Sequence, residues 1–143
     1  MLNKELQDTY KKILSREELK FTPQRLAVLE EMVRNDGHRE CEEIYMALKR
    51  KGKNVSRATV YRTIDILVKN NLARKLELGD GRARYENKVN IAHHDHLICT
   101  SCGKIVEFMD PKIEALQDTV ASEHNFTLSR HIHQLFGICN KCQ

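Results

Sequence analysis

The stretch HHDHLICTSCGKIVEF, residues 93–108, combines metal-ligating side chains with two short apolar runs. Its Cys99 and Cys102 can bind one ion from a single tight turn, and a second such pair, Cys139 and Cys142, follows further along the chain. Two Cys-x-x-Cys turns together complete a tetrahedral four-cysteine site. The sequence therefore predicts a structural zinc ion bound by these four thiolates.

A disulfide framework and a redox-active pair are the alternatives for these cysteines. The first residues lead into charged sequence rather than into the apolar segment of a secretory signal. No stretch approaches the roughly 18 apolar residues that a membrane span requires. We therefore expect a cytoplasmic protein without membrane association, in which thiols stay reduced and zinc is favoured. The fifth cysteine, Cys41, is expected to be a small, semi-buried residue.

Residues 93–96 supply more metal ligands than one tetrahedral site can use. Side chains alternate between the two faces of a strand, so His94 and His96 should point one way and His93 and Asp95 the other. Mixed imidazole and carboxylate ligands suit Fe(II), Mn(II), Co(II) or Zn(II) in exchangeable sites. We therefore expect metal binding beyond the structural zinc. A polar surface tract is the alternative.

The rest of the second part of the chain predicts a small mixed domain. Apolar runs at 96–99 and 103–108 are typical of a strand pair joined by the first cysteine turn. Asp110 and Pro111 suit the N-cap and first position of a helix. A final extended segment is expected over residues 126–138, ending at the second cysteine turn.

Charge is unevenly distributed along the 143 residues. Residues 1–88 hold 20 Lys or Arg and 14 Asp or Glu, whereas residues 89–143 hold 4 and 6. Six of the seven histidines lie in the second part. With 41% hydrophobic and 31% charged residues, a soluble globular protein is expected rather than a disordered one. The pattern indicates a basic half joined to a metal-rich half.

Helical periodicity predicts four helices in the basic half, followed by a hairpin. Thr22 and Pro23 suit the start of one helix, a shorter apolar stripe predicts another within residues 40–51, and Ser56 can cap the next. After these helices the apolar period changes to two, and residues 79–81, Gly-Asp-Gly, offer hairpin turn chemistry. Helices followed by a basic hairpin describe a winged helix-turn-helix.

The last of these helices is a candidate for DNA recognition. Residues 49–75 contain nine basic residues and a single acid. Tyr61 provides an aromatic ring beside Arg57 and Arg62, and the hairpin tip adds two further arginines, Arg82 and Arg84. Such a helix enters the major groove, where most arginines contact phosphates and few side chains reach base edges. We expect binding to double-stranded DNA; a solvated basic face is the alternative.

With these residues in place, the chain resembles the ferric uptake regulator family of metal-dependent bacterial repressors over essentially its whole length. The resemblance rests on LKFTPQR at residues 19–25, ATVYRTI at 58–64 and, above all, the stretch at 93–108. It implies an α+β fold: a winged helix-turn-helix DNA-binding domain at 1–88, a hinge at 89–93, and a small α/β dimerisation and metal-binding domain at 94–143.

The resemblance also implies three metal positions. The four cysteines would hold the structural Zn(II). A regulatory site between the domains would take His38, Glu86, His94, His96 and Glu107. A third site within the dimerisation domain would take His93, Asp95, Glu114 and His131. Fe(II) is expected at the regulatory site, with Mn(II), Co(II) or Zn(II) as substitutes.

For DNA, the resemblance implies Lys20 in the minor groove, Tyr61 against a base, and Arg57 and Arg62 near phosphates. Thr59 shares the exposed face of the same helix. The expected DNA-binding residues are Lys20, Arg57, Thr59, Tyr61 and Arg62. Residues 37–41 depart from the family pattern because they lack a Ser-x-x-Asp-type cap before the third helix.

The implied function is that of a homodimeric repressor that binds a palindromic operator with Fe(II) as corepressor and controls iron-uptake genes. Peroxide-, zinc- and manganese-sensing members of the same family are the alternatives. The peroxide-sensing branch typically has aspartate at the ligand position that corresponds to Glu107, so glutamate here favours iron sensing.

A zinc hydrolase or nucleobase deaminase is the alternative from a different class. Deaminases place proline directly before their Cys-x-x-Cys pair, whereas Ile98 and Ile138 stand there in this chain. A zinc ion with four thiolate ligands also has no open position for a reacting water. We therefore expect no enzymatic activity.

Overall fold

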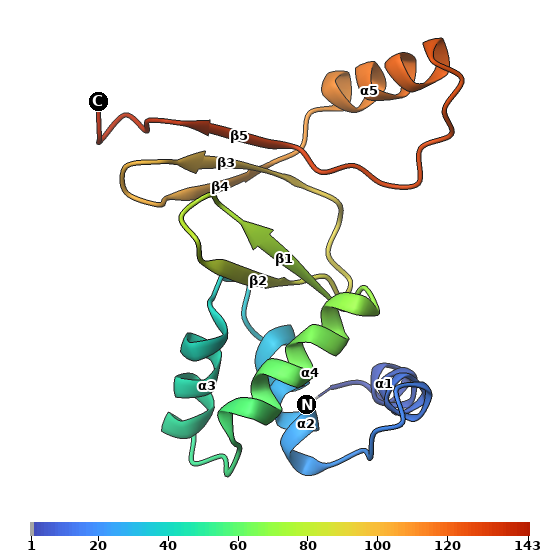
Figure 1. Ribbon diagram of the computed structural model, residues 1–143, viewed down its shortest axis with the longest axis vertical. Coiled ribbons are helices and arrows are strands. Elements are labelled where there is room, and N and C mark those ends of the chain that lie inside the picture. Colours follow the sequence, from blue (N-terminus) through green and yellow to red (C-terminus); the bar gives the residue numbers. More distant parts are fainter. Residues whose placement is uncertain (1) are drawn as a thin grey trace. The chain divides into compact units, whose positions relative to one another are not determined.

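The computed structural model describes residues 2–143, which form two compact units, one ending at Ile91 and the other beginning at Ala92. The first contains α1 (Lys4–Arg16), α2 (Pro23–Val33), α3 (Cys41–Arg50), α4 (Arg57–Lys69), β1 (Ala73–Glu77) and β2 (Ala83–Asn87). The second contains β3 (Asp95–Cys99), β4 (Ile105–Phe108), α5 (Pro111–Glu123) and β5 (Gln134–Gly137), as Figure 1 shows. Among residues 2–143, no helix combines the length and apolarity needed to cross a membrane.

Side-chain caps begin three of the predicted helices. Thr22 Oγ1 accepts a hydrogen bond from the backbone N–H of Arg25 at 3.3 Å. Ser56 and Asp110 cap α4 and α5 in the same way. Each cap satisfies a backbone donor that the first helical turn leaves without an intrahelical partner. The predicted starts of these helices are confirmed.

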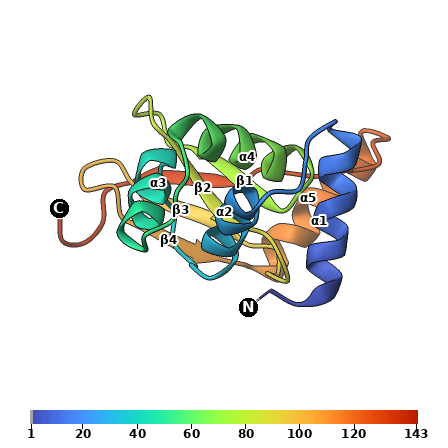
Figure 2. The same ribbon diagram turned by 90° about the horizontal axis from the view of Figure 1, so that it is seen from below.

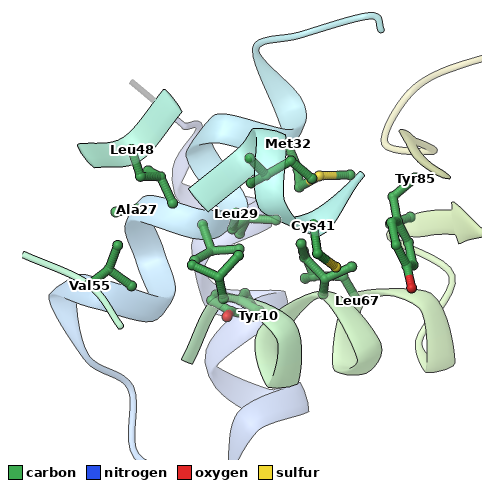
Figure 3. Close-up of a cluster of buried hydrophobic side chains, with 14 of the residues drawn as sticks. Tyr10, Ala27, Leu29, Met32, Cys41, Leu48, Val55, Leu67 and Tyr85 are labelled. Carbon is green, nitrogen blue, oxygen red and sulfur yellow. The ribbon is translucent and has the colours of Figure 1, made fainter. Parts of the chain in front are cut away.

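The helices of the first unit enclose one apolar core. In Figure 2, α2 lies between α3 and α1. Tyr10, Leu29 and Leu67 are completely buried, and the Tyr10 hydroxyl donates to the carbonyl oxygen of Arg25 at 3.2 Å. Figure 3 shows Cys41 within this core, close to Leu67 and Tyr85. The core fixes the helices on which the hairpin rests.

The predicted hairpin is present. Strands β1 and β2 pair antiparallel, with Glu77 opposite Ala83. Gly79 and Gly81 in the turn have φ angles of 79° and 76°, a region that favours residues without a Cβ atom. Helices followed by this hairpin make the first unit a winged helix, as the sequence predicted.

The second unit is built on a three-stranded sheet of order β4-β3-β5. Strands β3 and β4 are antiparallel and joined by the first cysteine turn, as predicted. The extended segment expected over residues 126–138 forms a strand only at β5, which pairs parallel to β3. The expectation was too long because residues 126–133 return from the end of α5 to the sheet and form no strand.

We expect Thr22→Ala to lower the free energy of unfolding of the first unit by about 1 kcal/mol, because the N–H of Arg25 loses its acceptor. Denaturant unfolding followed by circular dichroism measures the effect. Ser15→Ala, at an exposed position in α1, is the control and should change stability by less. Equal stability of the two variants would show that the cap contributes nothing.

Candidate metal centres

The four paired cysteines form one cluster. Their sulfur atoms all lie within 4.8 Å of one another, and all are free thiols. The Cys102 Sγ to Cys139 Sγ distance is 3.8 Å, far longer than the roughly 2.05 Å of a disulfide. It matches the edge of a tetrahedron around zinc, since Zn–S bonds of about 2.3 Å place neighbouring sulfurs about 3.8 Å apart. The geometry fits zinc and not a disulfide framework.

The electrostatics of this cluster also fit a cation. Backbone N–H groups of Cys102 and Cys139 lower the pKa of Cys99 to about 6, and the Cys139 N–H lies 3.3 Å from Cys99 Sγ. Hydrogen bonds with neighbouring thiols, first that of Cys139, instead raise the pKa of Cys142 to about 12. The site thus stabilises one thiolate, whereas four thiolates in the same place would repel one another. A bound divalent cation offsets this repulsion.

Cys41 stands apart from this cluster. It begins α3 and is 7% exposed, so it is more deeply buried than the sequence suggested. Burial raises the pKa of its thiol to about 11. A thiol that remains protonated at neutral pH is a poor nucleophile and a poor metal ligand. Cys41 is therefore a core residue.

A second cluster contains the four residues expected at the third site. His93 Nε2 lies 3.3 Å from both Asp95 Oδ1 and Glu114 Oε1, and His131 Nε2 lies 3.5 Å from the same two oxygens. Nitrogen and oxygen ligands at about 2.0–2.1 Å from a tetrahedral ion lie about 3.3–3.4 Å apart. Asp95 is 2% exposed. A buried carboxylate is stable only when it is paired, so this arrangement also fits a cation.

A third group of donors lies on the other face of the same segment. His96 is opposite Glu107 in the register of β3 and β4. His94 Nε2 lies 3.6 Å from Glu107 Oε1, and the rings of His94 and His96 are 4.9 Å apart. The structure thus follows the alternation expected for residues 93–96. The second unit presents three convergent donors here.

The first unit presents two further donors. His38 Nε2 lies 2.9 Å from Glu86 Oε2, and Glu86 is 3% exposed. Neither residue is near the other in sequence. An isolated antiparallel bridge between Arg39 and Tyr85 places their neighbours, His38 and Glu86, opposite each other. Two donors are too few for a tight site by themselves.

Four of the predicted DNA-binding residues, Arg57, Thr59, Tyr61 and Arg62, lie on α4. Arg57 is paired with an acid that the sequence analysis did not count. Its guanidinium makes contacts of 2.9–3.1 Å with the Glu42 carboxylate and lies 4.4 Å from the centre of the Tyr45 ring. The sequence window 49–75 missed this acid because α3 supplies it from outside the window.

The remaining expected DNA-binding residues are accessible. Tyr61 is 44% exposed, Lys20 and Arg62 are exposed, and Thr59 is partly exposed. The arginines of the hairpin are paired in this structure: Arg82 with Glu40 at 3.3 Å and Arg84 with Asp80 at 2.9 Å.

Comparison with known proteins identifies the family. The model of the ferric uptake regulator family matches residues 16–136. The chain belongs to the ferric uptake regulator family. It is thus a metal-responsive transcriptional regulator rather than a member of an enzyme family.

Relatives within the family agree with this assignment. The chain is 42% identical over 139 residues to the ferric uptake regulation protein of Campylobacter upsaliensis, covering 96% of this chain and 88% of that protein. It is 35% identical to the peroxide operon regulator of Bacillus subtilis over 124 residues, which cover 87% and 84% of the two chains.

A solved structure resembles the whole chain. The ferric uptake regulator of Helicobacter pylori, described as having three functional metal-binding sites, aligns with a TM-score of 0.86 and 35% identity. The alignment covers 96% of this chain and 91% of that one.

We expect the two kinds of cysteine to differ in alkylation. In the folded protein at pH 8, Cys41 should resist iodoacetamide, since with a pKa of about 11 only roughly one thiol in a thousand is ionised. A strong chelator should make the four clustered cysteines react while Cys41 does so only after denaturation. Mass spectrometry of the labelled peptides reports both rates. Early labelling of Cys41 would contradict its assignment to the core.

Proposed function

We propose that the chain is a homodimeric, Fe(II)-responsive repressor that binds a palindromic operator and controls iron uptake in the cytoplasm. One observation carries this proposal: a winged helix occurs in the same chain as a four-cysteine cluster and a cluster of imidazole and carboxylate donors. A winged helix supplies DNA binding, and exchangeable donors supply a response to metal.

In this proposal the four cysteines hold a structural zinc ion. Thiolates are soft, tightly binding ligands, and four of them leave no open coordination position. Such a site stabilises the second unit and takes no part in catalysis. The cluster of His93, Asp95, Glu114 and His131 would hold a further ion of the same unit through harder ligands.

The regulatory ion would be shared by the remaining five donors. His38 and Glu86 come from the first unit, whereas His94, His96 and Glu107 come from the second. When bound, the ion supplies a cross-link between side chains of different units, on either side of a hinge at residues 89–93. The ion binds more tightly to the arrangement of the units in which all five donors converge. The difference in affinity between the two arrangements determines how far the ion shifts their populations.

Fe(II) is the ion we assign to this site. Imidazole and carboxylate ligands accept Fe(II), Mn(II), Co(II) and Zn(II), so ligand type alone does not select among these metals. Glu107 favours iron sensing over peroxide sensing, because the peroxide-sensing branch typically has aspartate at the corresponding position. Zinc and manganese sensing are the other candidates.

The proposed DNA contacts lie on α4 and in the segment between α1 and α2. Tyr61 would contact a base, Arg62 a phosphate and Lys20 the minor groove, while Thr59 lies on the same face. Arg57 would reach a phosphate only after leaving Glu42. Its contribution should therefore be smaller than its position suggests, since forming one charged contact costs another.

A second copy of the chain would cover the apolar surface of the second unit. The exposed apolar residues of this unit include Val106, Leu116, Val120, Phe126, Leu135 and Phe136. Apolar side chains gathered in this number indicate an interface. A two-fold symmetric dimer presents two recognition helices, which matches a palindromic operator.

We expect His38→Ala and Glu107→Ala each to raise the Mn(II) or Fe(II) concentration needed for operator binding at least about tenfold. Zinc content and dimerisation should persist because the cysteines are unchanged. The double variant should be little weaker than either single one, since residues that share an ion are not additive. Anaerobic fluorescence anisotropy with labelled operator DNA measures the response.

His133→Ala is the matched control for this experiment. His133 contacts Gln117 at 3.4 Å and the Phe108 ring but belongs to no donor cluster. A metal response of His38→Ala equal to that of the control would remove His38 from the site. Fully additive losses in the double variant would argue against one shared ion.

We also expect the residues of α4 to differ in the kind of DNA binding they lose. Arg62→Ala should weaken binding to operator and random DNA alike and reduce the salt slope by about 1, as loss of a phosphate contact does. Tyr61→Ala should mainly reduce the preference for operator, by about 1 kcal/mol or more. Binding isotherms at several salt concentrations separate the two effects.

Arg57 and Glu42 extend this test. Arg57→Ala should cost less affinity than Arg62→Ala because Glu42 already neutralises Arg57, and Glu42→Gln should strengthen binding to all DNA. Weaker DNA binding by Glu42→Gln would mean that the carboxylate orients Arg57 for DNA rather than competing with it.

A further inference from the structure

A buried carboxylate in the first unit is not used by the proposed function. Glu31 lies on α2 and is 4% exposed. Its Oε1 accepts hydrogen bonds from Arg39 Nη1 at 2.8 Å and Asn35 Nδ2 at 3.1 Å. Its Oε2 accepts one from Lys51 Nζ at 2.5 Å. Burying a charge is costly, and such complete pairing is what makes it tolerable.

Two of the three partners of Glu31, Asn35 and Arg39, lie in the loop that carries His38. Residues 34–40 contain no helix and only an isolated bridge at Arg39. Asn35 and Arg39 also donate to the backbone carbonyl oxygen of Glu31, at 2.8 and 3.1 Å. Both the start and the end of the loop are therefore fixed to one residue of α2.

Arg39 also connects the loop to β2, which carries the proposed ligand Glu86. Its backbone N–H donates to the Tyr85 carbonyl oxygen at 3.1 Å, and the Tyr85 N–H donates to the Arg39 carbonyl oxygen at 2.7 Å. This bridge places His38 opposite Glu86, where the two side chains meet at 2.9 Å. The position of His38 therefore depends on Arg39, and the position of Arg39 depends on Glu31.

We propose that Glu31 is a positioning residue for the regulatory metal site, which keeps His38 beside Glu86 before any ion binds. This inference rests on the proposed function, in which His38 and Glu86 are ligands. A ligand on a loop that is already ordered binds more tightly, because less conformational freedom is lost on binding. Glu31 thereby sets the metal concentration at which the regulator responds.

The test uses the full chain with Glu114→Ala throughout, so that Mn(II) binding reports the regulatory site rather than the third cluster. Glu31→Gln should speed hydrogen exchange of the Arg39 amide in the zinc-loaded protein without Mn(II). It should also weaken Mn(II) binding about tenfold, the usual cost of losing a residue that orients a ligand. Zinc content should not change.

Glu17→Gln is the matched control. Glu17 also binds a lysine and an asparagine side chain, Lys69 at 2.8 Å and Asn70 at 3.4 Å, but it has no link to the His38 loop. It should change neither exchange at Arg39 nor Mn(II) affinity. If Glu31→Gln does not fold, Arg39→Gln removes the same attachment from a more accessible side chain and should give the same two effects.

The His38→Ala background separates the possible failures. Glu31→Gln should not weaken Mn(II) binding further there, because Glu31 acts through His38. A further loss in that background, or behaviour equal to Glu17→Gln, would overturn the positioning role. If His38→Ala alone leaves Mn(II) affinity unchanged, the proposed regulatory site fails, whereas exchange at Arg39 still reports whether Glu31 orders the loop.

Discussion

The alternation of side chains along one extended segment determines where the metal ligands of the second unit can lie. Residues 93–96 send His93 and Asp95 to one cluster and His94 and His96 to another. The ladder between β3 and β4 then places Glu107 opposite His96. A shift of one residue in this register would exchange the two faces and break both clusters. The hydrogen bonds of the ladder thus determine the coordination chemistry.

In the proposed function, the type of ligand separates the metal that stabilises the fold from the metal that is sensed. Four thiolates bind zinc tightly and at full coordination, so their ion is part of the fold. Imidazoles and carboxylates bind divalent ions more weakly and exchange them more readily. The soft and hard ligands meet in one strand, since β3 begins at Asp95 and ends at Cys99. In this proposal the tightly bound zinc ion fixes one end of β3, and ligands at the other end of β3 bind the exchangeable regulatory ion.

Features that depend on neighbouring residues were predictable from the sequence. The caps at Thr22 and Ser56, the Gly-Asp-Gly turn and the cysteine turn between β3 and β4 each depend on a few consecutive residues. The parallel pairing of β5 was not predictable, because α5 and residues 124–133 separate it from the strands before it. The contact between Glu31 and Lys51, which are 20 residues apart, was not predictable for the same reason. No periodic pattern marks a pairing between segments so far apart.

The charge on the DNA-binding face shows why such distant pairings matter for function. Along the chain, all but one of the charged residues in 49–75 are basic. In the folded protein, however, Arg57 is paired with Glu42 of α3, and Arg82 of the hairpin is paired with Glu40. An exposed ion pair contributes little to stability in water, so neither pair prevents a phosphate from replacing the carboxylate. Each replacement nevertheless gains less than a contact made by an unpaired arginine. Non-specific affinity for DNA comes from phosphate contacts, and these acids reduce it more than they reduce contacts with base edges. Phosphate contacts contribute to the binding of operator and random DNA alike, so we expect these acids to lower the affinity for both.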